Sequence, residues 1–313
     1  MSRLLVTGPD GSVGRGLVRE ARRQGHDVVA VPGPGGAPPG AWLDPDDAMH
    51  VATFEADLTQ SADRARIAAA EVDAIVHLAA VSSGADARRD PALANQVNAQ
   101  ATIGLGQALE AIGARPRLLF VSTAEVYGAG HDGPIAETTP PAPISPYAES
   151  KWQAEQGLGG LFASGIMVTT ARPFPHTGPG QDSRFVLPAF ARRLLEARRT
   201  GEREIAVGNL DVVRDFLDVR DVVRAYLLLL ERGEAGGVYN VASGTGQHLE
   251  QCFRDLARLV GVEAVPVRDA SLVRPADISG RVGDPARLVA ATGWSPQFSF
   301  ERTLQDLVDA QAD

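Results

Sequence analysis

The residues with the clearest chemical potential are Tyr147 and Lys151, which stand four positions apart in Tyr-Ala-Glu-Ser-Lys. Lys151 is the one lysine of the chain, against 29 arginines, which suggests that this position needs an ammonium. Side chains at i and i+4 of a helix share a face. A compact ammonium beside a phenol favours the phenolate and lowers the tyrosine pKa from about 10. The pair is a candidate general acid and base, although a chance pair on a helix surface has the same spacing.

Short apolar runs alternate with helical patterns over most of the chain. The runs lie at 3–7, 27–31, 52–56, 74–78, 117–122, 167–171 and 238–241, and the main helical patterns lie at 12–24, 61–70, 91–113, 146–161 and 219–232. Short, continuously apolar strands that alternate with helices are typical of a parallel sheet covered on both faces. The pattern therefore predicts an α/β protein with a doubly wound parallel sheet.

A glycine-rich turn joins the first apolar run to the first helical pattern. It contains Gly8, Gly11 and Gly14, with Ser12 and Val13 before the last glycine. Glycines permit the tight turn and let backbone amides approach a pyrophosphate, whose charge is favoured by the start of a helix. The spacing alone also fits an ordinary turn, but its strand-turn-helix context favours dinucleotide binding.

The regular alternation weakens after residue 172. One clear helical pattern at about 184–199 follows, and the stretch from 244 to 313 is typical of helices joined by Pro/Gly turns. We assign residues 1–172 and 212–243 to a dinucleotide-binding domain. Residues 173–211 and 244–313 are assigned to a smaller, discontinuous lobe that binds the substrate.

The second apolar run ends in Val31-Pro32-Gly33, without a carboxylate for the adenosine 2′-hydroxyl or an arginine for a 2′-phosphate. The cofactor is therefore NAD or NADP, with a mild preference for NADP because no carboxylate would repel the phosphate. Candidate walls for the adenine and the pyrophosphate follow the third and fourth runs: Asp57, Leu58, Leu78, Ala79 and Ala80. Small residues such as the two alanines are explained equally well by packing.

Polar residues follow the fifth apolar run, at the edge of a parallel sheet where ligands bind. Thr123 precedes Tyr147 by 24 positions, and its hydroxyl could hold the substrate oxygen that Tyr147 protonates. As an isolated residue, Thr123 would be an ordinary turn threonine.

Bulk properties narrow the class of protein. A net charge of −9 argues against a surface for nucleic acid, and no apolar stretch approaches the roughly 18 residues of a spanning helix. Met1-Ser2-Arg3 enters an apolar run directly, which argues against a signal peptide. Cys252 is the one cysteine, so no internal disulfide can form. We expect a cytoplasmic protein that binds no membrane and no metal.

The motifs together resemble the extended short-chain dehydrogenases/reductases, the NAD-dependent epimerase/dehydratase family. The resemblance covers essentially the whole chain and rests on T-G-x-x-G-x-x-G, H-L-A-A, S-T-A-E-V-Y-G, Y-x-x-x-K and Arg172-Pro173-Phe174 before Gly178-Pro179-Gly180. The second half, with Gly208-Asn209-Leu210-Asp211, Arg214-Asp215-Phe216-Leu217-Asp218-Val219 and Thr292-Gly293-Trp294-Ser295-Pro296, is most similar to GDP-4-keto-6-deoxymannose reductases and related 4,6-dehydratases.

The resemblance implies a Rossmann fold and roles for individual residues. Tyr147 is the acid and base, Lys151 also holds the nicotinamide ribose, and Thr123 completes the triad. The remaining roles that it implies are cofactor contacts from Asn98 and Pro173 and substrate contacts from Ser82, Arg214 and Arg274. The two arginines would hold a diphosphate, although each has an aspartate nearby that would explain it as an ion pair.

Two departures from the family pattern affect the substrate. Pro175 stands where family members usually have an asparagine that contacts the sugar nucleotide. Glu125 stands where the dehydratases have the acid that removes the C5 proton, but Ala124 occupies a neighbouring position that is acidic in the glucose-type enzymes. Glu125 therefore permits elimination chemistry without establishing it.

We expect an NAD(P)-dependent oxidoreductase that reduces a nucleoside-diphospho-4-keto-6-deoxyhexose at C4. The alternative is a nucleotide-sugar 4,6-dehydratase, epimerase or decarboxylase that recycles its cofactor, and a remote alternative is a non-catalytic dinucleotide-sensing regulator. The patterns at 91–113 and 146–161 carry more apolar surface than one sheet face needs. The resemblance implies that they pair in a four-helix bundle, so we expect a homodimer.

Overall fold

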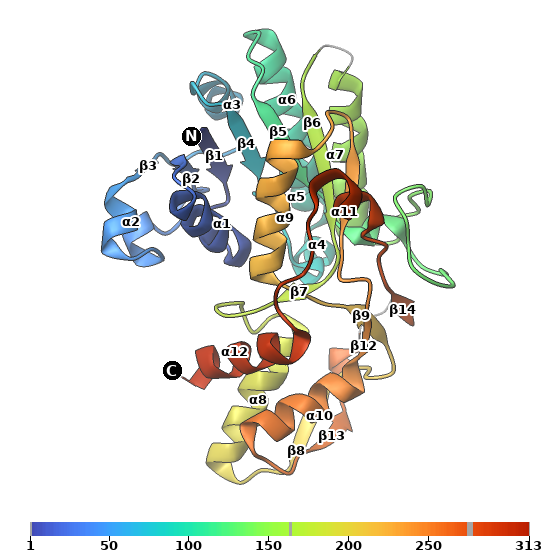
Figure 1. Cartoon of the computed structure of the whole chain (residues 1–313). Coiled ribbons are helices and arrows are strands. Elements are labelled where there is room, and N and C mark those ends of the chain that lie inside the picture. Colours follow the sequence, from blue (N-terminus) through green and yellow to red (C-terminus); the bar gives the residue numbers. More distant parts are fainter. Residues whose placement is uncertain (1, 163–164, 274–277, 313) are drawn as a thin grey trace.

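The centre of the protein is a seven-stranded sheet in which every pair of neighbouring strands is parallel, as a computed structural model shows (Figure 1). The model describes residues 2–162, 165–273 and 278–312, and the side chain of Phe162 is not described. The strand order is β11-β6-β5-β4-β1-β2-β3. The strands are β1 (Arg3–Thr7), β2 (Asp27–Val31), β3 (Val51–Thr53), β4 (Ala74–His77), β5 (Arg117–Val121), β6 (Val168–Pro173) and β11 (Val238–Val241).

The order reverses between β1 and β4, because the chain builds outward to β3 on one side and then returns to β4 on the other. In such sheets, ligands bind beyond the carboxyl ends of the strands at the reversal point. The segments that follow β1 and β4 contain the glycine-rich turn and Leu78-Ala79-Ala80. The topology therefore brings these two predicted cofactor segments together.

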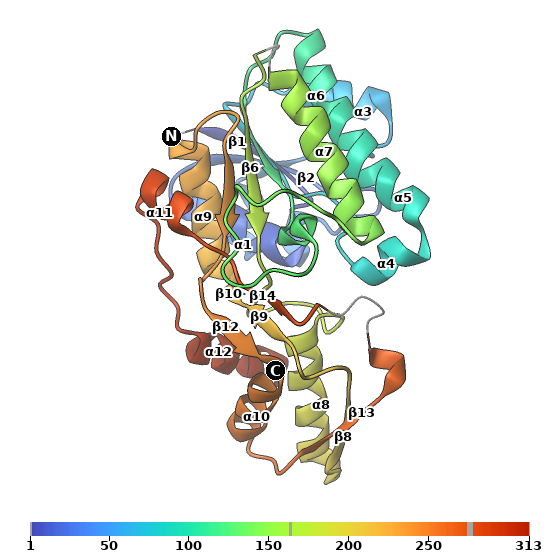
Figure 2. The same cartoon turned by 90° about the vertical axis from the view of Figure 1, so that its right-hand side faces the viewer.

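Helices cover both faces of the sheet, as the edge-on view in Figure 2 shows. One face is covered by α1 (Ser12–Arg23), α9 (Val219–Arg232) and α11 (Ala286–Thr292), and the other by α3 (Ser61–Ala68), α6 (Ala101–Ala111) and α7 (Pro146–Phe162). Fully buried valine, leucine and isoleucine side chains of the strands pack against each layer. This double burial explains why the strands are continuously apolar in sequence.

Shorter elements connect or extend these layers. They are η1 (Pro39–Ala41), α2 (Pro45–Met49), α4 (Gly84–Arg89), α5 (Pro91–Asn95), η3 (Ala124–Tyr127) and the π-helical stretch η2 (Gln96–Gln100) between α5 and α6. The predicted helix at 91–113 is thus one continuous helical path with a π-helical insertion. Such insertions occur frequently at functional sites.

A smaller lobe lies below the sheet in Figure 1 and has its own apolar core. Its helices are α8 (Val186–Thr200), α10 (Leu249–Val260) and α12 (Phe300–Ala312). Its strands and those that join it to the sheet are β7 (His176–Thr177), β8 (Glu204–Val207), β9 (Val213–Asp215), β10 (Leu217–Asp218), β12 (Gly246–His248), β13 (Val265–Arg268) and β14 (Gly280–Arg281), with η4 (Ala270–Leu272) after β13.

The two lobes exchange segments near the ends that we assigned from the sequence. Val212 and Phe216 pack in the core of the smaller lobe, whereas Leu288 and Trp294 pack in the core beneath the main sheet. We keep the division into two lobes as a proposal. When residues are assigned by the core in which they are buried, the segments around these four residues change lobe.

Candidate active site

The glycine-rich turn after β1 is closed so tightly that side chains are excluded from it. Gly8 has φ +67°, and a Cβ added there would lie 3.0 Å from the backbone of Ala79. A Cβ at Gly14 would lie 2.3 Å from the carbonyl oxygen of Gly8. Helix α1 then starts with Gly11 as its N-cap, with no side-chain cap and no acidic residue in its first turn. The turn therefore fits a dinucleotide pyrophosphate, which would meet free backbone amides and the positive helix end.

The turn after β4 is fixed from inside the core by His77. Its Nδ1 lies 2.8 Å from the Thr7 hydroxyl and its Nε2 lies 2.8 Å from the Thr102 hydroxyl. Burial, and then the charge of Lys151, lower the pKa of His77 to about 3, so this imidazole is neutral. The Thr7 hydroxyl also accepts a hydrogen bond from the amide of Ala79. His77 thus ties together the segments after β1 and β4.

Asn98 lies in the π-helical stretch and is fully buried. Its side-chain oxygen accepts from the Val81 amide at 2.8 Å, and its nitrogen donates to the Val81 carbonyl and to the Ser150 hydroxyl. Ser150 precedes Lys151 in α7. Asn98 therefore couples the segment after β4 to the helix that carries the candidate acid and base.

Tyr147 and Lys151 are placed by the start of α7. Ser145 accepts a hydrogen bond from the Ala148 amide, and Pro146 occupies the first helical position, where its fixed φ is favourable. Lys151 is 2% exposed, and its Nζ donates to the Val121 carbonyl at 2.7 Å. Burial lowers the pKa of Lys151 to about 7, while the Glu155 carboxylate acts in the opposite direction.

The pKa of Tyr147 corrects one part of our interpretation of the pair. Burial raises it well above its usual value, the Glu125 charge raises it further, and hydrogen bonding with Thr123 lowers it. Lys151 is not among the groups that shift the pKa of this phenol, contrary to our expectation, and its ammonium donates to the Val121 carbonyl. Tyr147 is therefore protonated at neutral pH and suited to donate a proton.

Thr123 and Glu125 lie beside this phenol on the short helix η3. Thr123 is the N-cap of η3, and its hydroxyl accepts from the Glu125 amide. Glu125 accepts a hydrogen bond from the Ser145 hydroxyl at 3.4 Å. The structure thus brings together the four residues that we predicted as catalytic, from the segment after β5 and from α7.

A buried ion pair beneath this group was missed by the sequence interpretation. Glu155 is 8% exposed and Arg172 is 4% exposed, and Arg172 Nη2 donates to Glu155 Oε2 at 2.6 Å. The Ser122 hydroxyl also donates to Glu155. Glu155 is one helical turn beyond Lys151 on the same face of α7, a spacing that could have revealed it. The pair clamps α7 to the ends of β5 and β6.

The remaining predicted cofactor residues are spread along the carboxyl edge. The Asp57 carboxylate accepts from both the hydroxyl and the amide of Thr59, which lowers its pKa, and Leu58 is buried. Pro173 is the buried last residue of β6. Asp57 is therefore engaged in its own turn, whereas Pro173 ends the strand next to β5.

The predicted substrate residues are less closely grouped. Ser82 is exposed in the segment before α4. Arg214 lies on β9 and donates to the carbonyls of Val213 and Ile278, each at 2.8 Å. Arg274 falls outside the described residues. The roles of these three residues stay predictions.

Arg281 is a second site residue that the sequence interpretation missed. It pairs with Arg214 in the register of β14 and β9, is 7% exposed, and donates to the Gly128 carbonyl at 3.1 Å. Its Nε has no hydrogen-bond partner among the described residues. Burial lowers the pKa of Arg281, and the Glu125 charge opposes this effect. A hollow of about 330 Å³ lies beside Arg281, bordered by the segment around His131.

The basis for preferring NADP is weaker in the structure than in the sequence. Glu55, which follows β3, accepts a hydrogen bond from the Gly35 amide at 3.1 Å. A Cβ added to Gly36 would lie 3.1 Å from Asp10 Oδ2. Two carboxylates from other segments therefore flank the loop after β2. Sequence distance hid them, because only the β2–β3 pairing brings Glu55 to this loop.

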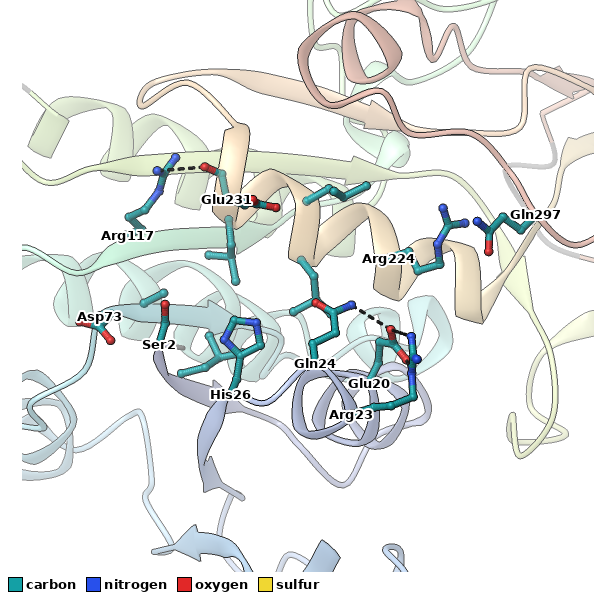
Figure 3. Close-up of a pocket in the computed structure, with 15 residues that line it drawn as sticks. Ser2, Glu20, Arg23, Gln24, His26, Asp73, Arg117, Arg224, Glu231 and Gln297 are labelled. Carbon is teal, nitrogen blue, oxygen red and sulfur yellow. Dashed lines mark hydrogen bonds and ion pairs between the residues drawn. The ribbon is translucent and has the colours of Figure 1, made fainter.

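A hollow of about 670 Å³ lies at the opposite edge of the sheet between α1 and α9 (Figure 3). Several of its polar side chains are engaged within the protein: Arg23 and Gln24 donate to the Glu20 carboxylate, and Arg117 donates to the backbone carbonyl of Glu231. It lies at the amino ends of the strands, away from the predicted site. Within the described ranges, no helix is both long and apolar enough to cross a membrane, and no cluster of three potential metal ligands is found.

Comparison with known proteins identifies the class. The model of the NAD dependent epimerase/dehydratase family matches residues 4–242, and the chain belongs to this family. The GDP-6-deoxy-D-mannose reductase of Pseudomonas aeruginosa is 40% identical over 240 residues, which cover 75% of this chain and 79% of that protein. The resemblance inferred from the motifs is thereby confirmed.

Solved structures agree with this classification. The structure of RMD from Pseudomonas aeruginosa complexed with NADPH superposes with a TM-score of 0.85 at 34% identity, covering 100% of this chain and 99% of that chain. The dTDP-glucose 4,6-dehydratase DesIV from Streptomyces venezuelae, with NAD bound, superposes with a TM-score of 0.87 at 28% identity, covering 98% and 96%. The predicted Rossmann fold is confirmed.

Proposed function

We propose that the protein is an NAD(P)-dependent reductase of a nucleoside-diphospho-4-keto-6-deoxyhexose and that it acts at C4 of the sugar. The observation that carries the proposal is the placement of the Tyr147 phenol beside Thr123 and one helical turn before Lys151. A ketone reductase needs a proton donor at this place. The 40% identical relative named as a GDP-6-deoxy-D-mannose reductase supports the same substrate class.

The chain's own residues supply the proton and orient the ketone. When bound, the nicotinamide cofactor supplies the hydride. Tyr147 donates its phenol proton to the C4 oxygen, and the Thr123 hydroxyl holds that oxygen by a hydrogen bond. Lys151 places an ammonium near the phenolate that remains. Glu155 favours the charged form of Lys151, because its carboxylate opposes the lowering of the Lys151 pKa by burial.

A dehydratase is the second candidate, favoured by one observation. Glu125 lies close enough to Tyr147 that its charge raises the pKa of the phenol, so a carboxylate is present beside the reacting carbons. An epimerase or decarboxylase would use the same hydride step. The relatives reported above are named as enzymes, which argues against a sensing regulator.

The reductase is tested by supplying GDP-4-keto-6-deoxymannose with NADH or NADPH and following the absorbance of the reduced cofactor. We expect one cofactor oxidised for each sugar reduced, and the ratio of kcat/KM for the two cofactors determines which is preferred. A dehydratase or epimerase instead turns over without net consumption of cofactor. Conversion of a fully hydroxylated nucleotide hexose with deuterium from solvent appearing at C5 or C6 would contradict the proposal.

Glu125→Gln separates the two chemistries in the same assay. Reduction of a ketone moves no carbon-bound proton, so kcat should change by less than about tenfold, or under about 1.4 kcal/mol. If Glu125 removes the C5 proton, the amide cannot accept it and the rate should fall by several orders of magnitude. The matched control is Glu149→Gln, an exposed glutamate of α7 that we expect to leave kcat unchanged.

Substrate binding completes the proposal. Arg214 would hold the diphosphate together with Arg274, and the smaller lobe would hold the nucleotide. Arg281 adds a third guanidinium next to Arg214 in the strand register. Pro175 replaces the family's usual asparagine and cannot make its contact with the nucleotide sugar. We therefore expect the arginines to contribute more of the substrate binding.

We also propose that the protein is a cytoplasmic homodimer that pairs through α5, η2, α6 and α7. Residues 91–109 contain no charged residue, in a chain that is 22% charged. Exposed positions on these helices are instead mostly glutamine, glycine and alanine, with Leu93 45% exposed. Interface centres are depleted of charged residues in this way. The single cysteine, buried and free, fits a reducing compartment.

Leu93→Glu tests the dimer against Val289→Glu, a similarly exposed position (42%) on α11. Sedimentation should show a dimer for the parent and for Val289→Glu, and a shift toward monomer for Leu93→Glu, because the new charges would be desolvated at the interface. A parent protein that sediments as a monomer at every concentration would contradict the dimer.

A further inference from the structure

Tyr226 on α9 carries a hydroxyl that the fold leaves unsatisfied. The side chain is 0% exposed, and its Oη finds no hydrogen-bond partner among the described residues. A buried hydroxyl without a partner costs stability, so native proteins rarely keep one without a reason. A phenylalanine would fill the same space without this cost.

The hydroxyls of two other core tyrosines form hydrogen bonds, unlike the hydroxyl of Tyr226. The chain has four tyrosines. Tyr239 accepts a hydrogen bond from the Glu234 amide at 3.0 Å, and Tyr127 donates to Asn240 Oδ1 at 2.7 Å. Tyr147 is the candidate acid. Among the described residues, Tyr226 is therefore the core tyrosine whose hydroxyl has no hydrogen-bond partner.

The direction of α9 aims this hydroxyl at the carboxyl edge of the sheet. The helix begins at Val219, against Gly178 in the segment beyond β6, where an added Cβ would lie 2.8 Å from Val219 Cγ1. Its later residues Leu227, Leu230 and Glu231 border the hollow at the amino edge. Side chains of a helix tilt toward its N-terminus. This tilt favours a Tyr226 side chain inclined from α9 toward the edge where we place the cofactor.

The core cluster that contains Tyr226 extends beneath the predicted cofactor site. The partly buried side chains that pack against this cluster include Val13, Leu78 and Val121. The first two belong to the segments after β1 and β4, and the Val121 carbonyl receives Lys151. Burial raises the pKa of Tyr226, and the nearby phenol of Tyr147 raises it further. Tyr226 thus approaches the site from the α9 side of the sheet, opposite α7.

We propose that the Tyr226 hydroxyl forms a hydrogen bond with the nicotinamide half of the bound dinucleotide. A phenol hydroxyl both donates and accepts, which suits the carboxamide and ribose groups of that half. Tyr226 would then be a cofactor-positioning residue whose partner arrives with the cofactor. This inference rests on the dinucleotide-binding part of the proposed function.

The test measures binding to Tyr226→Phe without catalysis. Titration of the reduced cofactor, followed by its fluorescence, should give a Kd about 3- to 10-fold higher than that of the parent protein. ADP-ribose, or its 2′-phosphate if NADPH is the cofactor, lacks the nicotinamide and should bind equally well to both proteins. The thermal midpoint of the cofactor-free variant should be unchanged or higher, because no satisfied hydrogen bond is lost.

Tyr239→Phe is the matched control. It should lower the thermal midpoint, because it removes the bond to Glu234, and leave the affinity for the reduced cofactor unchanged. An unchanged Kd for the reduced cofactor in Tyr226→Phe, or an equal loss of affinity for ADP-ribose, would overturn the inference. A lower midpoint in Tyr226→Phe would do so too, since it would reveal a structural partner. Failure of the parent to bind either dinucleotide would instead contradict the proposed function.

Discussion

Replacing Lys151 with arginine will lower kcat by about 10²- to 10⁴-fold, which is the usual contribution of positioned proton transfer. The pocket around Lys151 leaves no room for a planar fork, since Nζ bonds the Val121 carbonyl at 2.7 Å and lies 4.9 Å from the centre of the Phe120 ring. Arginine also presents five donors, which need partners that a closed site does not supply. Steady-state kinetics with saturating cofactor and ketone will measure the loss.

The fold should survive changes at this position, which can be checked with Lys151→Met. The pKa of Lys151 is lowered to about 7 by burial, so between pH 7 and its unfolded pKa of about 10.4 the unfolded chain binds more protons than the folded one. The buried lysine therefore lowers stability at neutral pH, and stability rises as pH increases through this window. Lys151→Met should retain or raise the thermal midpoint at pH 7. Activity of Lys151→Arg within about tenfold of the parent would contradict the acid and base assignment.

The sequence predicted the main sheet closely because its strands are buried on both faces. All seven apolar runs became neighbouring strands, from Arg3–Thr7 to Val238–Val241. The smaller lobe was predicted only in outline. Its strands β9, β10 and β14 have two or three residues each, too few for a period-two pattern to be recognised.

Some residues of the candidate site could likewise be predicted from the sequence, and others could not. Tyr147, Lys151 and Thr123 could be predicted because their order and spacing are local signals. Arg281, and in our proposal Tyr226, would reach the site only through tertiary packing, because they follow Tyr147 in the chain by 130 or more residues and by 79 residues. Nothing in the sequence around them distinguishes them from an ordinary surface arginine and an ordinary core tyrosine. The pKa values of Tyr147 and Lys151 were also beyond sequence reasoning, because burial determines both.

The buried pair Glu155–Arg172 should have the largest effect on stability of any side-chain pair near the site. Glu155→Met leaves the Arg172 guanidinium buried without a counter-charge. Arg172→Met leaves the Glu155 carboxylate buried without a counter-charge. Each single change should cost about 3–5 kcal/mol in the free energy of unfolding by urea. The double variant should cost much less than the sum, because no buried charge remains. Glu250→Met, which breaks the exposed pair with Arg254 on α10, should cost under about 1 kcal/mol.

The pH dependence of kcat, measured on the folded protein, is a second test of the role of Glu155. The charged group that acts on Lys151 is Glu155 on its own helix, whereas the phenol of Tyr147 is protonated and His77 is neutral. Glu155 raises the pKa of Lys151, so Glu155→Met should lower it below about 7. The ammonium is then lost at lower pH, and kcat should begin to fall with rising pH earlier than in the parent protein. A pair that served packing alone would change the urea midpoint and leave the pH profile of kcat where it was.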